Sequence, residues 1–399
     1  MTARLDGRYR GLELVISARG EFKQGDGVAC VTGSSESLPL KMTIQIEMPA
    51  DERALTEFVR FHDRVYEYRS ARWPVASRRQ LHILMGRPPF GDGREIKAFI
   101  ARDRGAIVAR AAAIIDHHYI EHWKEPLGHL MMFEAMPNTG AAVRAMVDSA
   151  CEWLRDRGME AARAGTTGVG DSPFAIDEYE MLPPSIVRQN PGYYHALLKD
   201  AGFETEKGWV DYKIEVTPAL IARYESALEA ARRAGFSILP LKELDPELRV
   251  QHFTRIWNDA FKHHWGMAPR REAEVSAMFR NFGLGSGLET SVIAYRGGEP
   301  VGVLIALASS TVHVILAPGR AVREAEKLNW LGIGVHESAR GRGVNLAMAS
   351  YTYLELIRLG AKYLSYTLVL DDNWPSRRTA EKLGANVCAS YMTYRRTPL

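Results

Sequence analysis

The sequence predicts an α/β protein built from two copies of one unit, and two observations support this. The apolar run from Leu328 to Val335 is too short for a buried helix and indicates a buried strand, which a tight glycine-containing turn joins to a long helix ending near Gly360. A similar order of hairpin, strand and helix occurs once before, in the first half of the chain. Strands that alternate with helices are typical of α/β folds.

The composition narrows the class of protein. The chain has 399 residues, enough for two or three domains, and a formal net charge of +3. Because a nucleic-acid-binding domain usually carries a concentrated basic face, we expect no nucleic-acid partner. No run of about 18 apolar residues occurs, so we expect no membrane span. Three scattered cysteines favour neither a disulfide framework nor a metal site, and a reducing cytoplasm is the expected location.

Residues 1–41 are expected to lie outside the fold. They mix Arg, Gly, Ser and Glu with one brief apolar run, and they lack the hydrophobic segment of about 7 to 15 residues that a signal peptide contains. Two interpretations are open: a disordered N-terminal extension, or a start codon assigned too far upstream.

The first unit is expected to span residues 42–216. Apolar stripes of helical spacing and runs of branched and aromatic residues predict its elements. They are a strand from Met42, a helix at 51–65, strands at 97–101, 107–115 and 128–133, and a helix at 139–157. Arg104-Gly105 supplies the hairpin turn, and Gly158 suits the end of the last helix.

A helical linker is expected at residues 217–235, because Thr217 and Pro218 form a typical helix start and apolar residues follow at helical spacing. The second unit then spans residues 236–399. Its predicted strands are 236–241, 291–295, 301–307, 328–335 and 363–370, and its predicted helices are 246–262, the segment from the 340–343 turn to Gly360, and Asn373 to Lys382.

The turn Arg340-Gly341-Arg342-Gly343 is predicted to bind a phosphate. It lies at a helix N-terminus, where unpaired backbone N–H groups and the helix dipole attract an anion. The two glycines allow a phosphate to approach the backbone closely, and the two arginines add positive charge.

At these residues the chain resembles the GNAT acetyltransferase superfamily, whose signature is Arg/Gln-x-x-Gly-x-Gly/Ala between a strand and a helix. Here the signature reads Arg340-Gly341-Arg342-Gly343-Val344-Asn345, and Asn345 departs from the small final residue. A second match is Asn373 at the end of the next strand, followed by a short helix that ends at Leu383-Gly384-Ala385. Many members carry a tyrosine on that helix that protonates the departing thiolate, and Ala380 stands in its place.

The resemblance implies a fold of two tandem GNAT-like domains, each a mixed central sheet flanked by helices. The first copy has residues 138–143 where the second has the 340–345 turn, and it lacks both arginines, so only the second copy is expected to bind acetyl-CoA. The residues implied to contact this co-substrate are Gly334, Val335, Arg340, Gly341, Arg342, Gly343, Val344, Asn345, Asn373 and Ser376. In the family, the backbone at the position of Val335 binds the thioester oxygen.

Two residues are candidates for proton transfer. Asp371 ends the strand beside the expected reaction centre and could accept a proton directly or through water, although aspartate is also common as a cap at strand ends. Tyr391, on the expected last strand, could replace the acid missing at Ala380, although aromatic residues at alternate strand positions usually serve packing.

The segment His263-His264-Trp265 lies where the family places substrate-recognition loops. These side chains could line a pocket for a polar amine. Equally, Trp265 could cover the core while both histidines lie on the surface. Adjacent histidines cannot face one metal ion from a helix, so we expect no zinc site.

These observations predict an N-acetyltransferase that transfers an acyl group from CoA to the amine of a small metabolite by direct attack on the thioester. Two alternatives remain open. One is a non-catalytic acyl-CoA sensor or scaffold, which the missing tyrosine and the departure at Asn345 favour. The other is a transferase of similar fold that uses aminoacyl-tRNA as donor.

Overall fold

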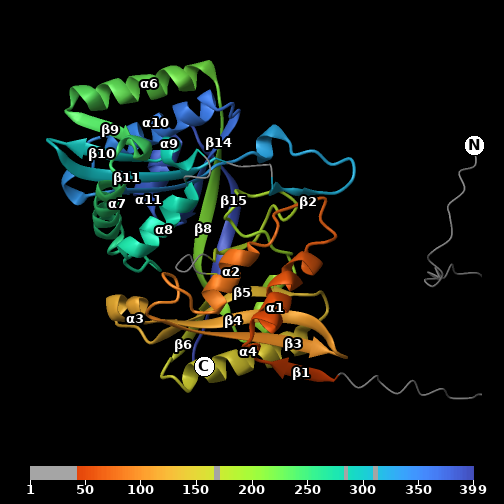
Figure 1. The fold of residues 1–399 in the computed structure, drawn as a ribbon. Coiled ribbons are helices and arrows are strands. Elements are labelled where there is room, and N and C mark those ends of the chain that lie inside the picture. The colour runs from red at the N-terminus through yellow and green to blue at the C-terminus, as the bar shows by residue number, and fades with distance from the viewer. Residues whose placement is uncertain (1–42, 166–170, 283–285, 309–312) are drawn as a thin grey trace, which may run out of the picture. The chain divides into compact units, whose positions relative to one another are not determined.

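Residues 43–165, 171–282, 286–308 and 313–399 are described in the computed structural model of the chain. The expectation for residues 1–41 lies outside this described part. Residues 42–399 form one unit by their contacts, shown as a ribbon in Figure 1.

Each helix and strand predicted for the first half is present, together with further elements. The strands are β1 (Ile44–Glu47), β2 (Ala71–Arg72), β3 (Arg94–Asp103), β4 (Ala106–Asp116), β5 (Leu127–Ala135), β6 (Ala161–Ala164), β7 (Phe174–Ala175) and β8 (Glu204–Glu215). The helices are α1 (Glu52–Val65), α2 (Ser77–Leu84), α3 (His117–Trp123), α4 (Gly140–Arg155) and α5 (Tyr194–Asp200). The pattern did not reveal α2, α3, β6 or the two-residue strands, which are short, and it also missed the 12-residue strand β8.

The second half begins with α6 (Pro218–Arg233), which Thr217 caps by accepting a hydrogen bond from the Leu220 amide at 3.3 Å. The other helices are α7 (Pro246–Phe261), α8 (Glu272–Phe282), α9 (Gly287–Thr290), α10 (Val344–Arg358) and α11 (Trp374–Lys382). The strands are β9 (Phe236–Pro240), β10 (Val292–Arg296), β11 (Glu299–Leu307), β12 (Ile315–Leu316), β13 (Trp330–Val335), β14 (Tyr363–Leu370) and β15 (Asn386–Arg396).

The two halves exchange their last strands. The C-terminal strand β15 pairs with β6 of the first half and with β8, whereas β8 pairs on its other side with β14 of the second half. One sheet therefore runs β1-β3-β4-β5-β6-β15-β8-β14, with β5 and β6 parallel and its other pairs antiparallel. Figure 1 shows β8 and β15 side by side between the other strands of the two halves.

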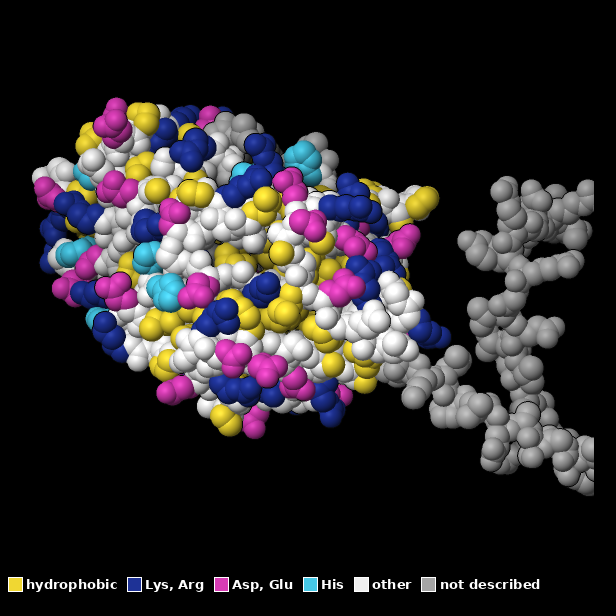
Figure 2. Space-filling model, turned by 60° about the horizontal axis from the view of Figure 1, so that its bottom comes forward, with side chains coloured by type: hydrophobic (Ala, Val, Ile, Leu, Met, Phe, Trp, Pro, Cys, Tyr) yellow, Lys and Arg dark blue, Asp and Glu magenta, His cyan; other side chains and the backbone are white. Residues whose placement is uncertain are grey.

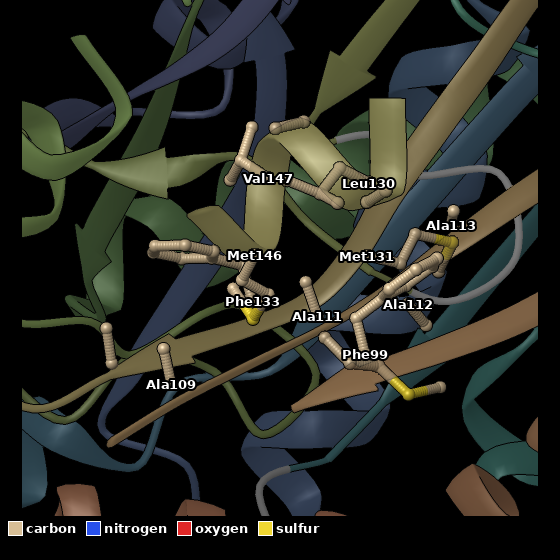
Figure 3. Packing of buried hydrophobic residues seen from close by; sticks show 14 of the residues in the cluster. Phe99, Ala109, Ala111, Ala112, Ala113, Leu130, Met131, Phe133, Met146 and Val147 are labelled. Atoms are coloured by element: carbon tan, nitrogen blue, oxygen red, sulfur yellow. The ribbon is translucent and has the colours of Figure 1, made fainter. Parts of the chain in front are cut away.

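The core of the first half combines small and large side chains. β4 contributes fully buried alanines, and larger residues of β3, β5 and α4 fill the space around them, as Figure 3 shows. The labelled residues are Phe99, Ala109, Ala111, Ala112, Ala113, Leu130, Met131, Phe133, Met146 and Val147. Alternating sizes allow a helix to pack closely on a sheet without voids.

The smaller sheet of the second half has the order β13-β11-β10-β9 and is covered on both faces. Successive residues of a strand point to opposite faces. Leu304 of β11 accordingly packs in the cluster that contains α10, while Val303 and Ile305 pack in the cluster that contains α7 and α8. This arrangement fixes the C-terminal end of β13 between α7 and the turn that begins α10.

Charges of both signs are interspersed over the face shown in Figure 2. This distribution agrees with a total of 51 lysines and arginines against 48 aspartates and glutamates.

Candidate functional site

Near the start of β13, side chains rather than backbone-to-backbone hydrogen bonds join β13 to β14. The Thr367 hydroxyl accepts a hydrogen bond from the Leu331 amide at 2.8 Å and donates one to the Leu331 carbonyl oxygen at 3.0 Å. Two residues earlier, the Asn329 side chain bonds the backbone N–H and carbonyl of Ser365 at 2.8 and 3.0 Å. Both pairs advance by two residues together, so the strands run parallel there.

A cavity of about 410 Å³, which we call the cleft, opens beyond this junction. It lies between the end of β13, the end of α7, the turn before α10 and the start of α11. Six residues predicted to contact CoA line it: Gly334, Val335, Arg340, Asn345, Asn373 and Ser376. His263 and His264, predicted to bind substrate, line it as well.

The backbone of β13 presents donors to the cleft. The N–H of Leu331 points towards β14, and alternate N–H groups of a strand point to the same side, so those of Ile333 and Val335 point into the cleft. The N–H of Gly334 faces β11 instead, where Gly334 pairs with Val303. The predicted backbone donor at Val335 thus has the required direction, and Ile333 is a further donor that the sequence did not reveal.

Gly334 has a different function, which is to let α7 approach. A Cβ atom added to it would lie 2.9 Å from side-chain atoms of both Ala260 and Phe261. The absence of a side chain therefore permits the close packing of α7 on β13 that forms one wall of the cleft.

The turn before α10 is open to the outside of the protein. Gly341 and Gly343 have φ of 74° and 80°, a region that favours glycine, and a Cβ atom added at either would meet no atom within 4 Å. Gly343 is the N-cap of the 15-residue helix α10. The Arg340 side chain holds the turn in place by donating to the Val335 carbonyl at 3.1 Å and lying 3.4 Å from the Ala260 carbonyl. The geometry fits the approach of a phosphate to the backbone.

The remaining residues of the signature have distinct positions. Arg342 is exposed, whereas the side chain of Val344, the first residue of α10, is buried, so only its backbone can reach a ligand. Asn345, which replaces the small residue of the signature, donates to the Thr379 hydroxyl at 2.8 Å. This bond joins the first turn of α10 to α11 at the edge of the cleft.

Asn373 and Ser376 shape the start of α11. The Asn373 side chain accepts from the Ser376 amide at 3.3 Å, and the Ser376 hydroxyl lies 3.0 Å from the hydroxyl of Tyr366 on β14. Burial raises the pKa of Tyr366 to about 12, so its hydroxyl stays protonated. Ser376 lies one helical turn before Ala380, where the resemblance expects a tyrosine. Tyr366 therefore brings a phenol close to that position from the strand, and no spacing rule could have revealed it.

His264 lies between the cleft and a second cavity of about 150 Å³, which we call the inner cavity. Its Nδ1 is 3.1 Å from the Trp265 carbonyl oxygen, an acceptor, so Nδ1 carries the proton of the neutral ring. Nε2 has no hydrogen-bond partner within the described residues. Burial lowers the pKa of His264, which favours the neutral ring with Nε2 as a free base.

Three predicted site residues lie elsewhere. The Asp371 side chain covers Gly208, where an added Cβ would lie 2.1 Å from its Oδ2. Tyr391 is buried with its hydroxyl 3.4 Å from Asp211. Trp265 packs on Trp209 and has the guanidinium of Arg163 4.3 Å from its ring centre. None of the three lines the cleft or the inner cavity. The sequence could not reveal this, because its pattern predicts an element but not the direction of each side chain.

A third cavity of about 340 Å³ lies where the two halves meet, and we call it the central cavity. It shares Met267, Arg270, Trp330 and Leu368 with the inner cavity. A buried ion-pair cluster forms part of its wall and links the halves: Arg94 lies 2.8 Å from Asp116 and 2.7 Å from Glu274. The cleft, the inner cavity and the central cavity thus adjoin in that order.

Two kinds of feature are absent from the described residues. In residues 43–165, 171–282, 286–308 and 313–399, no group of three or more His, Cys, Asp or Glu side chains could hold a metal ion. No helix of that part of the chain has the length and apolar character needed to cross a membrane.

The chain is similar to several known proteins. No family model matches the sequence. A protein named bacterial ceramide synthase, from Caulobacter vibrioides (strain NA1000 / CB15N), is 24% identical over 337 residues, which are 77% of this chain and 85% of that relative.

Two solved structures share the fold at low identity. The first is the GCN5-related glucosamine N-acetyltransferase region of a fungal multi-domain β-N-acetylglucosaminidase, with a TM-score of 0.55, 16% identity and coverage of 89% of this chain and 38% of that one. The second is a tandem GNAT protein from the clavulanic acid biosynthesis pathway, with a TM-score of 0.54, 13% identity and coverage of 89% and 98%. The chain therefore has the mixed α/β fold of the GNAT acetyltransferases, including their tandem form.

Proposed function

We propose that the protein is an acyl-CoA-dependent N-acyltransferase that transfers the acyl group to an amine by direct attack on the thioester. The observation that carries this proposal is the cleft between β13 and β14, which begins at the open glycine turn and ends at His264 and Tyr366. A helix N-terminus with two glycines suits a pyrophosphate, and backbone N–H groups at a strand end suit the oxygen of a thioester.

The CoA substrate would extend from the turn into the inner cavity. Its pyrophosphate would accept hydrogen bonds from the backbone of the 340–345 turn, and its pantetheine arm would pass Asn373 and Ser376, which line both the cleft and the inner cavity. The carbonyl oxygen would meet the N–H groups of Ile333 and Val335. These donors stabilise the negative charge that develops on this oxygen as the amine attacks.

The proton and the leaving sulfur have candidate partners at the inner end. The amine nitrogen forms a bond with the carbonyl carbon as the carbon–sulfur bond breaks, and Nε2 of His264 accepts the amine proton. With Ser376 as donor to its oxygen, the Tyr366 hydroxyl is free to donate a hydrogen bond to the departing thiolate. The proton held by His264 then passes to the sulfur, which gives free CoA and an amide.

The relative named bacterial ceramide synthase supports transfer to an amine, because a ceramide is the amide of a long-chain amine. The central cavity supports an acceptor or acyl group larger than a methyl group, since apolar side chains such as Ile305, Leu307 and Trp330 line one side of it.

The test is thiol release from acetyl-CoA and from longer acyl-CoAs with a panel of primary amines. Release that depends on the amine, with the amide identified by mass spectrometry, supports the proposal. Tight CoA binding without turnover would favour the sensor or scaffold, and binding of aminoacyl-tRNA without binding of CoA would favour the alternative donor.

A further inference from the structure

The central cavity is lined by two arginines that form no ion pair with a described carboxylate, although the charge of Glu274 acts on one of them, Arg270. Arg79 of α2 comes from the first half and Arg270 from the segment between α7 and α8. Within the described part of the chain neither forms an ion pair. The other arginine of the wall, Arg94, is bound to both Asp116 and Glu274, and Asp171 forms an ion pair with Arg188. The pairing of the wall is therefore complete except for Arg79 and Arg270.

Each of these two guanidinium groups lies near an aromatic ring. Arg270 lies 5.3 Å from the ring centre of Trp257, and its Nε is buried without a hydrogen-bond partner among the described residues. Arg79 lies 5.8 Å from the ring centre of Phe90. Burial lowers the pKa of both side chains; for Arg270 the charge of Glu274 partly offsets this effect, and the nearby charge of Arg79 adds to it.

Arg79 is exposed and Arg270 half-buried, and both line the central cavity. A partly buried arginine without an ion-pair partner is stabilised when an anion binds it. A guanidinium group offers several donors in a planar fork, the geometry that a carboxylate or phosphate accepts.

The position of Arg270 connects this charge to the reaction site. It lines both the central cavity and the inner cavity, and His264 lines the inner cavity. The opposite wall is apolar and comes largely from the second half, with Met278, Ile305 and Leu307 among its residues. A ligand of the central cavity therefore meets cationic and apolar surfaces within reach of the inner cavity.

We propose that the central cavity is the acceptor site, and that Arg79 and Arg270 bind an anionic group, a carboxylate or a phosphate, of an amphipathic amine. This inference rests on the proposed function, since it names the class of acceptor. The amine would enter the inner cavity next to His264, the anionic group would bind the two arginines, and the hydrocarbon part would lie along the apolar wall.

The test measures direct binding of matched probes by titration calorimetry, with and without CoA. The probes are leucine, leucinol phosphate, inorganic phosphate, and leucinamide, an amine that lacks an anionic group. One anionic amine should bind about tenfold or more tighter than leucinamide, and Arg79→Gln or Arg270→Gln should each remove about that factor. Arg78→Gln is the matched control, because Arg78 is an exposed neighbour on α2 that does not line the cavity.

Two controls accompany the titrations: Arg→Lys variants should keep part of the affinity, and thermal unfolding checks that the Gln variants fold. The outcomes distinguish failure of the acceptor-site proposal from failure of the proposed function. Equal affinity for leucinamide and both anionic amines, or unchanged binding in both Gln variants, would overturn the inference while leaving CoA binding intact. Inorganic phosphate that binds as tightly as leucinol phosphate would also overturn it, since the site would then serve a free anion. Anionic amines that bind normally to a protein without CoA affinity would instead contradict the proposed function.

Discussion

The hydroxyl of Thr367 bonds both the N–H and the carbonyl of Leu331, and this single side chain marks the point where β13 and β14 cease to lie together. The cleft begins directly beyond it. The Thr367 side chain satisfies the backbone of β13 at Leu331. The backbone N–H groups nearer the end of β13 remain available to a ligand.

Thr367→Val should therefore lower both the stability of the protein and its affinity for CoA. Valine has a similar shape but leaves the Leu331 amide unpaired, so we expect the free energy of unfolding to fall by about 1 to 3 kcal/mol and CoA affinity to fall with it. Thr393→Val is the control, because Thr393 is buried and donates to the Lys207 carbonyl away from the cleft. Equal CoA affinity in the two variants would show that the hydrogen bonds between Thr367 and Leu331 do not shape the cleft.

Gly343→Ala should lower CoA affinity by about tenfold or more, measured by calorimetry, because a methyl group at φ of 80° disturbs the backbone that faces the pyrophosphate. Gly158→Ala provides the matched control: Gly158 has φ of 82° and equally open surroundings at the end of α4. Both variants should lose about 1 to 2 kcal/mol of stability. A loss of CoA affinity in the Gly158 variant alone would place the ligand in the first half.

His264→Gln should reduce the rate of acyl transfer by about 10² to 10⁴ while CoA still binds. In the native protein the lowered pKa of His264 keeps the ring neutral, so kcat/KM should rise with pH through a pKa below the usual value of about 6.5 and be level at neutral pH. The variant should lose this limb of the pH profile. An unchanged profile would remove the assignment of His264 as the base.

Tyr366→Phe should lower kcat by about tenfold to a hundredfold and leave KM for acyl-CoA nearly unchanged, since the hydroxyl acts on the departing sulfur. Tyr353→Phe removes a buried hydroxyl that donates to the Ser365 carbonyl and serves as control for stability. The effect should also shrink with thioesters whose thiol is a better leaving group. A uniform effect over all thioesters would indicate a structural contribution only.

Asp211 should make stability depend on pH. Burial raises its pKa to about 7, above the value of about 3.9 in an unfolded chain, so the folded protein holds the proton more tightly. The contribution of Asp211 to the free energy of unfolding should therefore be highest below about pH 4, fall as the pH rises from about 4 to 7, and be level above 7. Asp211→Asn should remove this loss, on the order of a few kcal/mol between pH 5 and pH 8 in denaturant titrations. If Asp211→Asn showed the same pH dependence of stability as the native chain, Asp211 would not be the group responsible.

The pattern of apolar residues predicted most of the long elements and the glycine turn, because helix periodicity and helix ends are local properties, but it did not predict the long strand β8 or the helix α8. The exchange of β8 and β15 was not predicted, since a strand shows the same alternation whichever neighbour it pairs with. The other residues of the site could not be predicted, because they are brought together by elements that are far apart in the sequence. The Tyr366 hydroxyl reaches Ser376 only because β14 folds against α11, and Trp265 lies against Arg163 of β6, far away in the sequence.

The central claim is that the turn beginning α10 binds the pyrophosphate of CoA. A crystal structure of the protein with CoA tests it most directly. The account predicts pyrophosphate oxygens about 3 Å from backbone nitrogens of the 341–345 segment, with the thiol near His264 and Tyr366. A CoA molecule bound at another surface, with the 340–345 turn empty, would contradict it.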